Sequence, residues 1–241
     1  MKPIYILQHL SGDGPAYLAD WLQQQRLPFR VFNTQAGQDF PDSLRDCSGL
    51  AILGGEMSAN DPLPSLRQAE QLFLQAVRDG IPTLGHCLGG QLMARALGAG
   101  VAASPAPEVG WQTLQLSGEE EARSWLAPQD LEQPPTVFHW HYEAFQLPTG
   151  ARRLAGTAAC PVQAFSLGPH LAMQWHVELD EVKLARWSLE DGEEHRQTRL
   201  DHPTTVQSGP AMREAAAVLL PRQQALARHI YGRWWGLMSQ G

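Results

Sequence analysis

The sequence predicts an α/β fold built on a doubly wound, mostly parallel sheet flanked by helices, with an antiparallel extension. Apolar stretches typical of strands alternate with helical patterns from residue 4 to residue 97, which indicates parallel strands joined by helices. The segment 50–53 is wholly apolar, as a central strand buried on both faces requires. After residue 100, short strand patterns follow one another directly, which favours an antiparallel or mixed arrangement there.

The individual elements follow from the same patterns. In the first half, strands are expected at 4–10, 29–32, 50–53 and 81–84, and helices at 16–25, 66–77 and 88–97. In the second half, strands are expected at 109–116, 136–140, 154–159, 162–167 and 171–176. A helix at 180–189, a polar connector at 190–203 and two helices at 211–220 and 222–237, separated by a proline, complete the chain.

The C-terminal helices form an extension of the main unit. We divide the chain into a domain at 1–185 and a helical extension at 186–241 packed on the same domain. Leu226, Ile230 and Trp234 recur at intervals of four, which is typical of a helix with one buried face. The alternative is a subunit contact made by the adjacent tryptophans near the C-terminus.

Composition excludes several classes of protein. The chain has 241 residues, of which 43% are hydrophobic and 18% charged, as expected for one compact domain with at most a short appendage. Its 18 basic against 25 acidic residues give a net charge of −7, which argues against nucleic acid as the main partner. Three scattered cysteines indicate neither a disulfide framework nor a zinc site. With no signal peptide and no membrane-spanning apolar run, a soluble cytoplasmic protein is expected.

The segment Gly85-His86-Cys87-Leu88-Gly89-Gly90-Gln91 joins a predicted strand to a predicted helix. A cysteine flanked by glycines at such a turn is typical of a nucleophile elbow. The helix N-terminus favours the thiolate of Cys87, and its free N–H groups can bind an oxyanion. The alternative is a buried structural cysteine.

Two further segments lie where a ligand of such a sheet binds. Gly54 and Gly55 follow the preceding predicted strand and could complete an oxyanion hole, although an ordinary glycine-rich turn is equally consistent with them. His176 and Glu178 stand two residues apart at the end of the last predicted strand, so alternation points both the same way. Glu178 could then orient the imidazole, as in a catalytic triad, or the two could be ordinary surface residues.

Together these motifs resemble the class I glutamine amidotransferase family, and most of all its stand-alone members related to the glutaminase domain of GMP synthase. The elbow fits the family pattern Gly-x-Cys-x-Gly-x-Gln, and the segments 54–58 and 174–178 fit two further family motifs. Softer matches lie at 109–111 and 139–148, and the resemblance covers residues 45–185. It implies a flavodoxin-like sheet.

The resemblance also implies a reaction and a set of roles. Cys87 would attack the side-chain amide of glutamine and form a γ-glutamyl thioester, releasing ammonia and then, on hydrolysis, glutamate. His176 would carry the protons and Glu178 would orient it. The remaining implied site residues are the oxyanion-hole residues Gly55 and Leu88 and the substrate-binding residues Gln91, His139 and His141.

The sequence departs from the family in ways that leave alternatives open. Val177 replaces the usual proline, and His86 replaces an aliphatic residue, where it either tunes the thiolate or fills space. No synthase domain is attached, so the glutaminase would either pass ammonia to a separate synthase subunit or act alone. A γ-glutamyl hydrolase acting on a γ-glutamyl amine or peptide, or a catalytically silent binding module, are the alternatives. No cofactor is implied, and two histidines at 139 and 141 are too few for a metal site.

Overall fold

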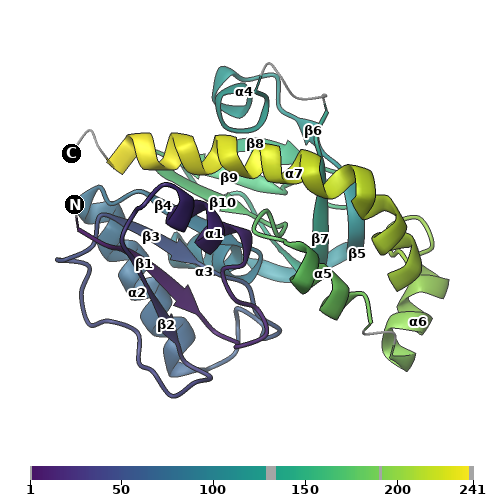
Figure 1. Ribbon diagram of the computed structural model, residues 1–241, viewed down its shortest axis with the longest axis horizontal. Helices are drawn as coiled ribbons and strands as arrows, with labels where there is room; N and C mark the ends of the chain where they lie inside the picture. Colours follow the sequence, from purple (N-terminus) through teal and green to yellow (C-terminus); the bar gives the residue numbers. More distant parts are fainter. Residues whose placement is uncertain (1, 129–133, 190–191, 239–241) are drawn as a thin grey trace.

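A computed structural model describes residues 2–128, 134–189 and 192–238. Its main sheet has eight strands in the order β2-β1-β3-β4-β10-β9-β8-β6. The first five run parallel, and β10, β9, β8 and β6 pair antiparallel. The predicted fold class, a doubly wound sheet with an antiparallel extension, is confirmed (Figure 1). The strands of this sheet are β1 (Ile4–Gln8), β2 (Phe29–Asn33), β3 (Gly49–Ile52), β4 (Thr83–His86), β6 (Gln115–Leu116), β8 (Arg152–Gly156), β9 (Ala164–Leu167) and β10 (His170–Met173).

Helices cover both faces of this sheet because its central strands are apolar on both sides. Along β1, Ile4 and Ile6 pack toward helices α1 and α7, whereas Tyr5 and Leu7 pack toward α2 and α3. Figure 1 shows α7, in yellow, lying along the sheet beside α1. The helices are α1 (Tyr17–Gln24), α2 (Pro64–Asp79), α3 (Leu88–Ala96), α4 (Glu120–Leu126), α5 (Glu181–Trp187), α6 (Glu193–Asp201) and α7 (Gly209–Met238).

A separate two-stranded ribbon stands at one end of the molecule. It pairs β5 (Val101–Thr113) with β7 (Thr136–Phe145). The single strand predicted at 109–116 is therefore wrong: its first part belongs to this ribbon and its last two residues form β6 in the main sheet. The start of β5 escaped prediction because Pro105 and Pro107 interrupt the strand pattern, and the register indeed shifts between Ala103 and Glu108.

The C-terminal half of the chain differs from the prediction in two places. One helix, α7, replaces the two predicted at 211–220 and 222–237, and Figure 1 shows it bending along its length. Pro221 is exposed, so the carbonyl of Ala217 that loses its N–H partner lies on the solvent side, while Leu220 and Leu226 anchor the helix on either side of it.

The connector predicted at 190–203 is also wrong over most of its length, because residues 193–201 form α6; residues 190 and 191 lie outside the described residues. Among the described side chains of α6, only that of His195 is buried, stacking on Trp140 with ring centroids 5.6 Å apart. Such a helix shows no apolar periodicity to detect.

Side chains of α7 belong to the main core. Leu226, Ile230 and Trp234 are buried against α1 and the sheet. The division of the chain after residue 185 stays a prediction. Within residues 2–128, 134–189 and 192–238, no helix combines the length and the apolar character needed to cross a membrane.

Candidate active site

Cys87 lies in a strained turn between β4 and α3. Its backbone has φ 46° and ψ −109°, in a region that residues with a side chain rarely adopt. The Cys87 N–H donates to the carbonyl of Met173 at 2.8 Å, which ties the turn to β10. The structure therefore has the strand–turn–helix geometry that the sequence predicts for a nucleophile elbow.

The glycines of the turn are needed for close packing. A Cβ built on Gly89 would collide with the backbone carbonyl of Ile52, and one on Gly90 would lie 2.7 Å from the carbonyl of Met173. Helix α3 thus begins directly against β3 and β10, which brings its N-terminus to the carboxyl edge of the sheet.

We expect Gly89→Ala to destabilise the protein by about 3 kcal/mol, because the new methyl group meets rigid backbone rather than a flexible side chain. Gly232→Ala is a matched control: Gly232 lies within α7 with nothing within 4 Å of a built Cβ, so this substitution should stabilise by about 0.5–1 kcal/mol. Urea unfolding of both variants measures the difference. Equal stability of the two would contradict this account of the turn.

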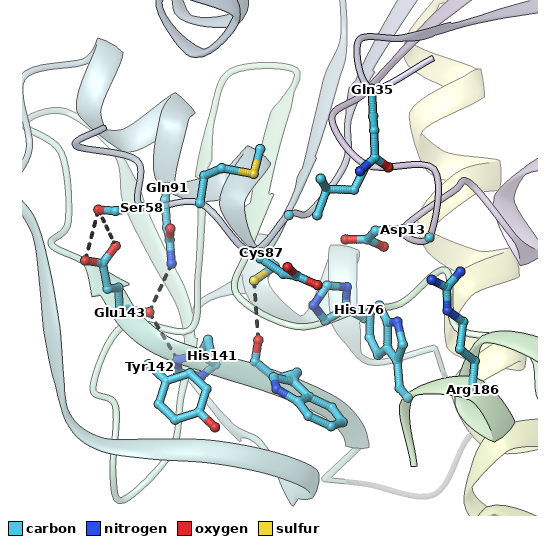
Figure 2. A pocket seen from close by; sticks show the side chains of 17 residues that line it. Asp13, Gln35, Ser58, Cys87, Gln91, His141, Tyr142, Glu143, His176 and Arg186 are labelled. Carbon is cyan, nitrogen blue, oxygen red and sulfur yellow. Dashed lines mark hydrogen bonds between the residues drawn. The ribbon is translucent and has the colours of Figure 1, made fainter. Parts of the chain in front are cut away.

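His176 lies beside Cys87 (Figure 2), and Glu178 lies beside His176. The Nδ1 of His176 is 2.8 Å from Oε1 of Glu178, so Nε2 is the ring nitrogen left to face the cysteine. Burial alone would lower the pKa of His176, but the charges of Glu178 and Cys87 and hydrogen bonds with both raise it to about 10. The structure thus brings the three predicted catalytic residues together, although they come from distant parts of the chain.

The reason given for the His176–Glu178 contact is nevertheless wrong. The strand predicted at 171–176 ends at Met173, so strand alternation does not orient these side chains. They belong instead to a turn, in which the N–H of Leu179 donates to the carbonyl of His176 at 3.2 Å. The His176 N–H donates to the carbonyl of Phe138 at 2.9 Å and fixes this turn against β7.

Cys87 and His176 open onto a pocket of about 460 Å³, shown in Figure 2. Cys87 is 5% exposed and His176 3%, so each reaches the pocket with only an edge of its side chain. The pocket is lined by Leu10, Gly12, Asp13, Gln35, Gly55, Glu56, Met57, Ser58, Cys87, Gln91, Trp140, His141, Tyr142, Glu143, His176, Arg186 and Trp187.

The predicted oxyanion-hole residues are neighbours. A Cβ built on Gly55 would lie 3.0 Å from a methyl carbon of Leu88, so the loop after β3 touches the start of α3. Within the part of the chain that the structure describes, neither the Gly55 N–H nor the Leu88 N–H donates to another protein group. Both donors therefore remain available to a ligand.

Two of the three predicted substrate-binding residues line the pocket. Gln91 donates from Nε2 to the carbonyl of Glu143 at 3.0 Å, and Nδ1 of His141 lies 3.2 Å from the same carbonyl. His139 does not line the pocket: it is fully buried, two residues deeper along β7, against His141 and Trp175. Burial lowers the pKa of His139 well below its ordinary value, so its ring is neutral.

Comparison with known proteins assigns the family. A family profile described as "Glutamine amidotransferase class-I" matches residues 18–184, more than half of the chain. This chain belongs to the class I glutamine amidotransferase family. The resemblance inferred from the motifs is thereby confirmed.

Individual relatives agree with this assignment. The chain is 28% identical over 181 residues to the glutamine amidotransferase-like protein YfeJ of Salmonella typhimurium, covering 73% of this chain and 75% of YfeJ. It is 36% identical over 152 residues to a GMP synthase of Aeropyrum pernix, covering 62% of this chain but only 28% of that synthase. The crystal structure of a glutamine amidotransferase from Methylobacillus flagellatus matches with a TM-score of 0.90 and 34% identity, covering 98% of this chain and 95% of that one.

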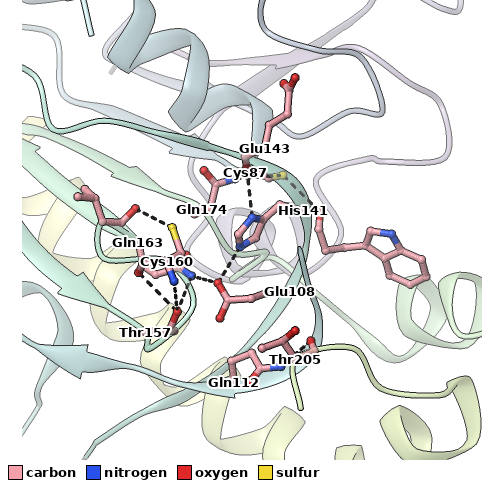
Figure 3. A network of polar contacts seen from close by, with 12 residues as sticks. Cys87, Glu108, Gln112, His141, Glu143, Thr157, Cys160, Gln163, Gln174 and Thr205 are labelled. Atoms are coloured by element: carbon pink, nitrogen blue, oxygen red, sulfur yellow. Dashed lines mark hydrogen bonds and ion pairs between the residues drawn. The ribbon is translucent and has the colours of Figure 1, made fainter. Parts of the chain in front are cut away.

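Behind the pocket of this class I chain lies a buried polar cluster (Figure 3). Glu108 of β5 stands opposite His141 of β7, with 3.3 Å between carboxylate oxygen and Nε2, and Gln163 donates to the same carboxylate. Glu108, His139 and His141 offer three ligand atoms within 4.8 Å of one another, and so do Asp13, His176 and Glu178. Protein partners already engage Glu108 and His141, and the absence of a metal stays a prediction.

The residues that sequence reasoning missed surround Glu178 and the pocket rim. Lys183 and Asp13 form a buried pair beside the Glu178 carboxylate, and Arg186 borders the pocket. One signal was available for Asp13, since it sits in a Gly-Asp-Gly loop directly after a parallel strand, where ligands of such sheets bind. Lys183 carries no such signal, because it is a single charge in a short helix.

Buried histidines give this family member a defined stability profile with pH. Burial lowers the pKa of His9, His86 and His170 to about 4, so these rings stay neutral in the folded protein while the unfolded chain takes up protons near pH 6.5. Stability should therefore fall as the pH drops from 6.5, by about 2 kcal/mol for each ring by pH 5.

His176 affects the stability of the folded protein above pH 6.5. Its raised pKa contributes stability that is fully present below pH 6.5 and is lost as the pH rises toward 10. The free energy of unfolding should thus be largest near pH 6.5. Urea unfolding at pH 5, 6.5 and 9 measures this, and a flat profile would show that these rings are not held as described.

Proposed function

We propose that the chain is a cysteine-dependent glutaminase of the amidotransferase type. The observation that carries this proposal is a cysteine at a strained elbow, beside a carboxylate-bound imidazole, at the floor of an open pocket. Two backbone N–H groups without protein acceptors among the described residues lie next to it. Nucleophile, base and oxyanion donors are the parts that acyl transfer needs.

In the proposed reaction, the Cys87 thiolate attacks the side-chain carbonyl carbon of glutamine. The Gly55 and Leu88 N–H groups stabilise the oxyanion that forms. His176 gives its proton to the amide nitrogen, and the carbon–nitrogen bond breaks. Ammonia departs, and a γ-glutamyl thioester remains on Cys87. Water then attacks the thioester and gives a proton to His176, the carbon–sulfur bond breaks, and glutamate leaves. Glu178 holds the ring of His176 throughout.

Gln91 and His141 are the proposed substrate-binding residues, because both side chains line the pocket. Each is fixed by the carbonyl of Glu143, and Ser58 in turn donates to the Glu143 carboxylate at 2.9 Å. His139 is proposed only as a support for His141, since it lies beneath it. Side chains held by hydrogen bonds in this way are already placed to position a substrate.

A separate synthase subunit is the proposed receiver of ammonia. The chain spans only 28% of the matched Aeropyrum pernix GMP synthase, so most of that synthase has no counterpart in this sequence. Three unpaired cysteines fit the reducing cytoplasm, where we expect the protein to act.

A γ-glutamyl hydrolase is the second candidate, and one observation favours it. Arg186 borders the pocket and its guanidinium makes no hydrogen bond or ion pair with the described residues, so it could bind a leaving group larger than ammonia. Free glutamate should be followed with glutamine and with a panel of γ-glutamyl amines and peptides. Turnover of a γ-glutamyl amine without turnover of glutamine would contradict the glutaminase proposal. No turnover of glutamine or of any γ-glutamyl compound would favour a catalytically silent binding module.

A diazo-ketone analogue of glutamine should label the protein at Cys87 alone. Burial raises the pKa of both the Cys47 and Cys160 thiols to about 11, so neither is a thiolate at neutral pH. Peptide mass spectrometry after labelling at pH 7.5 locates the adduct, and an excess of glutamine should protect against it. An adduct at Cys47 or Cys160, or none, would count against the site.

A further inference from the structure

The carboxylate of Glu178 is held by more than His176. Its Oε1 accepts hydrogen bonds from both His176 Nδ1 at 2.8 Å and Lys183 Nζ at 3.0 Å. Lys183 also donates to Oδ1 of Asp13 at 2.6 Å. All of these side chains are buried. Charges of alternating sign therefore run from Asp13 through Lys183 and Glu178 to His176 and Cys87.

The choice and burial of Lys183 need an explanation. The sequence contains only two lysines among its 18 basic residues, Lys2 and Lys183. Among the described residues, Lys183 is the only lysine or arginine whose side chain is buried. Removing an ammonium group from water costs several kcal/mol unless charged partners compensate. A lysine offers a compact point charge, and here its Nζ donates to both the Asp13 and the Glu178 carboxylates.

Helix α5 and the loop after β1 hold this pair against the site. Lys183 lies over the ring of Trp187, 5.1 Å from its centroid, and the same ring meets the His176 ring edge-on at 4.7 Å. On the other side, a Cβ built on Gly54 would lie 2.5 Å from Asp13 Oδ2 and 2.8 Å from Cε1 of His176. Asp13 and Lys183 thus close off the side of the His176–Glu178 pair that faces the loop and α5.

We propose that Lys183, held in place by Asp13, is a positioning residue that keeps Glu178 ionised and aligned with the imidazole of His176. This inference rests on the proposed function, since it concerns the same site. Without the ammonium group, the buried Glu178 carboxylate would lose a hydrogen bond and the opposite charge that offsets its burial, and it would take up a proton more readily. A protonated Glu178 no longer stabilises the imidazolium, and His176 and Cys87 then return to their neutral, unreactive forms.

The pKa values of the cluster agree with this arrangement. Burial opposes the charge on Lys183, but Asp13 and Glu178 raise its pKa to about 12. Burial likewise opposes the charge on Glu178, but Lys183, His176 and His86 hold its pKa well below the usual value. The titratable groups that face this cluster from the packed elements are His9 and Asp13 of the β1–α1 loop, His86 of β4, Cys87 of the elbow, His139 of β7, His176, Lys183 of α5 and Tyr231 of α7.

Alkylation of Cys87 by iodoacetamide tests the inference without any substrate turnover. The rate at which the Cys87 peptide is modified, measured by mass spectrometry at pH 6 and pH 9, reports the reactive thiolate. We expect Lys183→Met to slow alkylation at pH 6 by at least about tenfold relative to the wild type, and by less than about threefold at pH 9. A tenfold loss at pH 6 corresponds to a shift of the curve of alkylation rate against pH by about one pH unit. Lys2→Met, the matched change at the exposed lysine, should leave both rates unchanged.

A double variant separates positioning from simple charge balance. Lys183→Met combined with Asp13→Asn leaves no unpaired aspartate in the interior. Thermal unfolding shows whether Lys183→Met alone is folded, and if it is not, the double variant replaces it in the test. We expect the double variant to keep the tenfold loss at pH 6. A return to wild-type rates would overturn the inference, because Lys183 would then serve only to neutralise Asp13. Equal slowing at both pH values, or no slowing, would overturn it as well.

The outcome also distinguishes this inference from the proposed function. A wild-type Cys87 that reacts at neither pH would overturn both. A reactive wild-type Cys87 whose pH dependence is the same in the variants would overturn only the role of Lys183.

Discussion

Cys87→Ser is expected to abolish glutamine hydrolysis, with a loss in kcat of at least about 10⁴-fold, while leaving the fold intact. Serine is nearly isosteric with cysteine, so the strained backbone at φ 46° and the bond from its N–H to Met173 should persist. Its hydroxyl, however, keeps its proton at neutral pH, and the site has no thiolate to attack the amide. Glutamate release measures the loss, and thermal unfolding checks the fold.

The matched control is Cys47→Ser. Cys47 is also buried and its Sγ donates to the carbonyl of Gly49 at 2.8 Å, a bond that a serine hydroxyl can replace. We expect its activity to stay within about twofold of the wild type, because small polar substitutions away from a site act mainly on stability. A loss in kcat of less than about tenfold in Cys87→Ser would show that another group is the nucleophile.

The elbow could be predicted because all its determinants are local. A strand, a cysteine among glycines and a helix follow one another within residues 83–96, and the glycine contacts with Ile52 and Met173 explain why larger residues are excluded. The same is true of the first half of the sheet, where each short apolar strand pairs in parallel with a sequence-near neighbour.

The surroundings of Glu178 could not be predicted, because their contacts join distant segments. Lys183 meets Asp13 across 170 positions of the chain. No periodicity or spacing in the sequence indicates such a pair. Aspartate and lysine are usually exposed, so neither residue alone suggests a buried position. The buried pair of Lys183 and Asp13 forms only when α5 packs against the loop after β1, so it can be recognised only in the folded structure.

The family resemblance implied a substrate-binding role for both His139 and His141, and the structure places only His141 at the pocket. The two rings do lie on one face of β7, with centroids 5.5 Å apart. The pocket reaches only His141, whereas His139 is fully buried and packs beside Trp175. Alternation gives the face of a strand on which a side chain lies, whereas depth along the strand depends on which distant segments cover it.

His176→Ala is expected to cost about a hundredfold more in kcat than Glu178→Gln, with both losses exceeding about 10³-fold. Alanine removes the group that carries protons between the thiol, the leaving nitrogen and water. Glutamine keeps a hydrogen-bonding group near Nδ1 but removes the charge that stabilises the imidazolium. Steady-state kinetics of glutamate release compares the two, and a greater loss in Glu178→Gln would reverse the roles assigned to them.

The pH dependence of Glu178→Gln gives a second, independent reading of the same roles. The Glu178 charge helps to raise the pKa of His176 to about 10, so its removal should make His176 lose its proton at lower pH. The basic limb of kcat/KM should then move to lower pH by at least about one unit. Glu70→Gln is the matched control: Glu70 is buried in ion pairs with Arg67 and Arg95, outside the pocket lining, and its loss should not move the limb. An unmoved limb in Glu178→Gln would mean that the carboxylate orients His176 without stabilising its charged form.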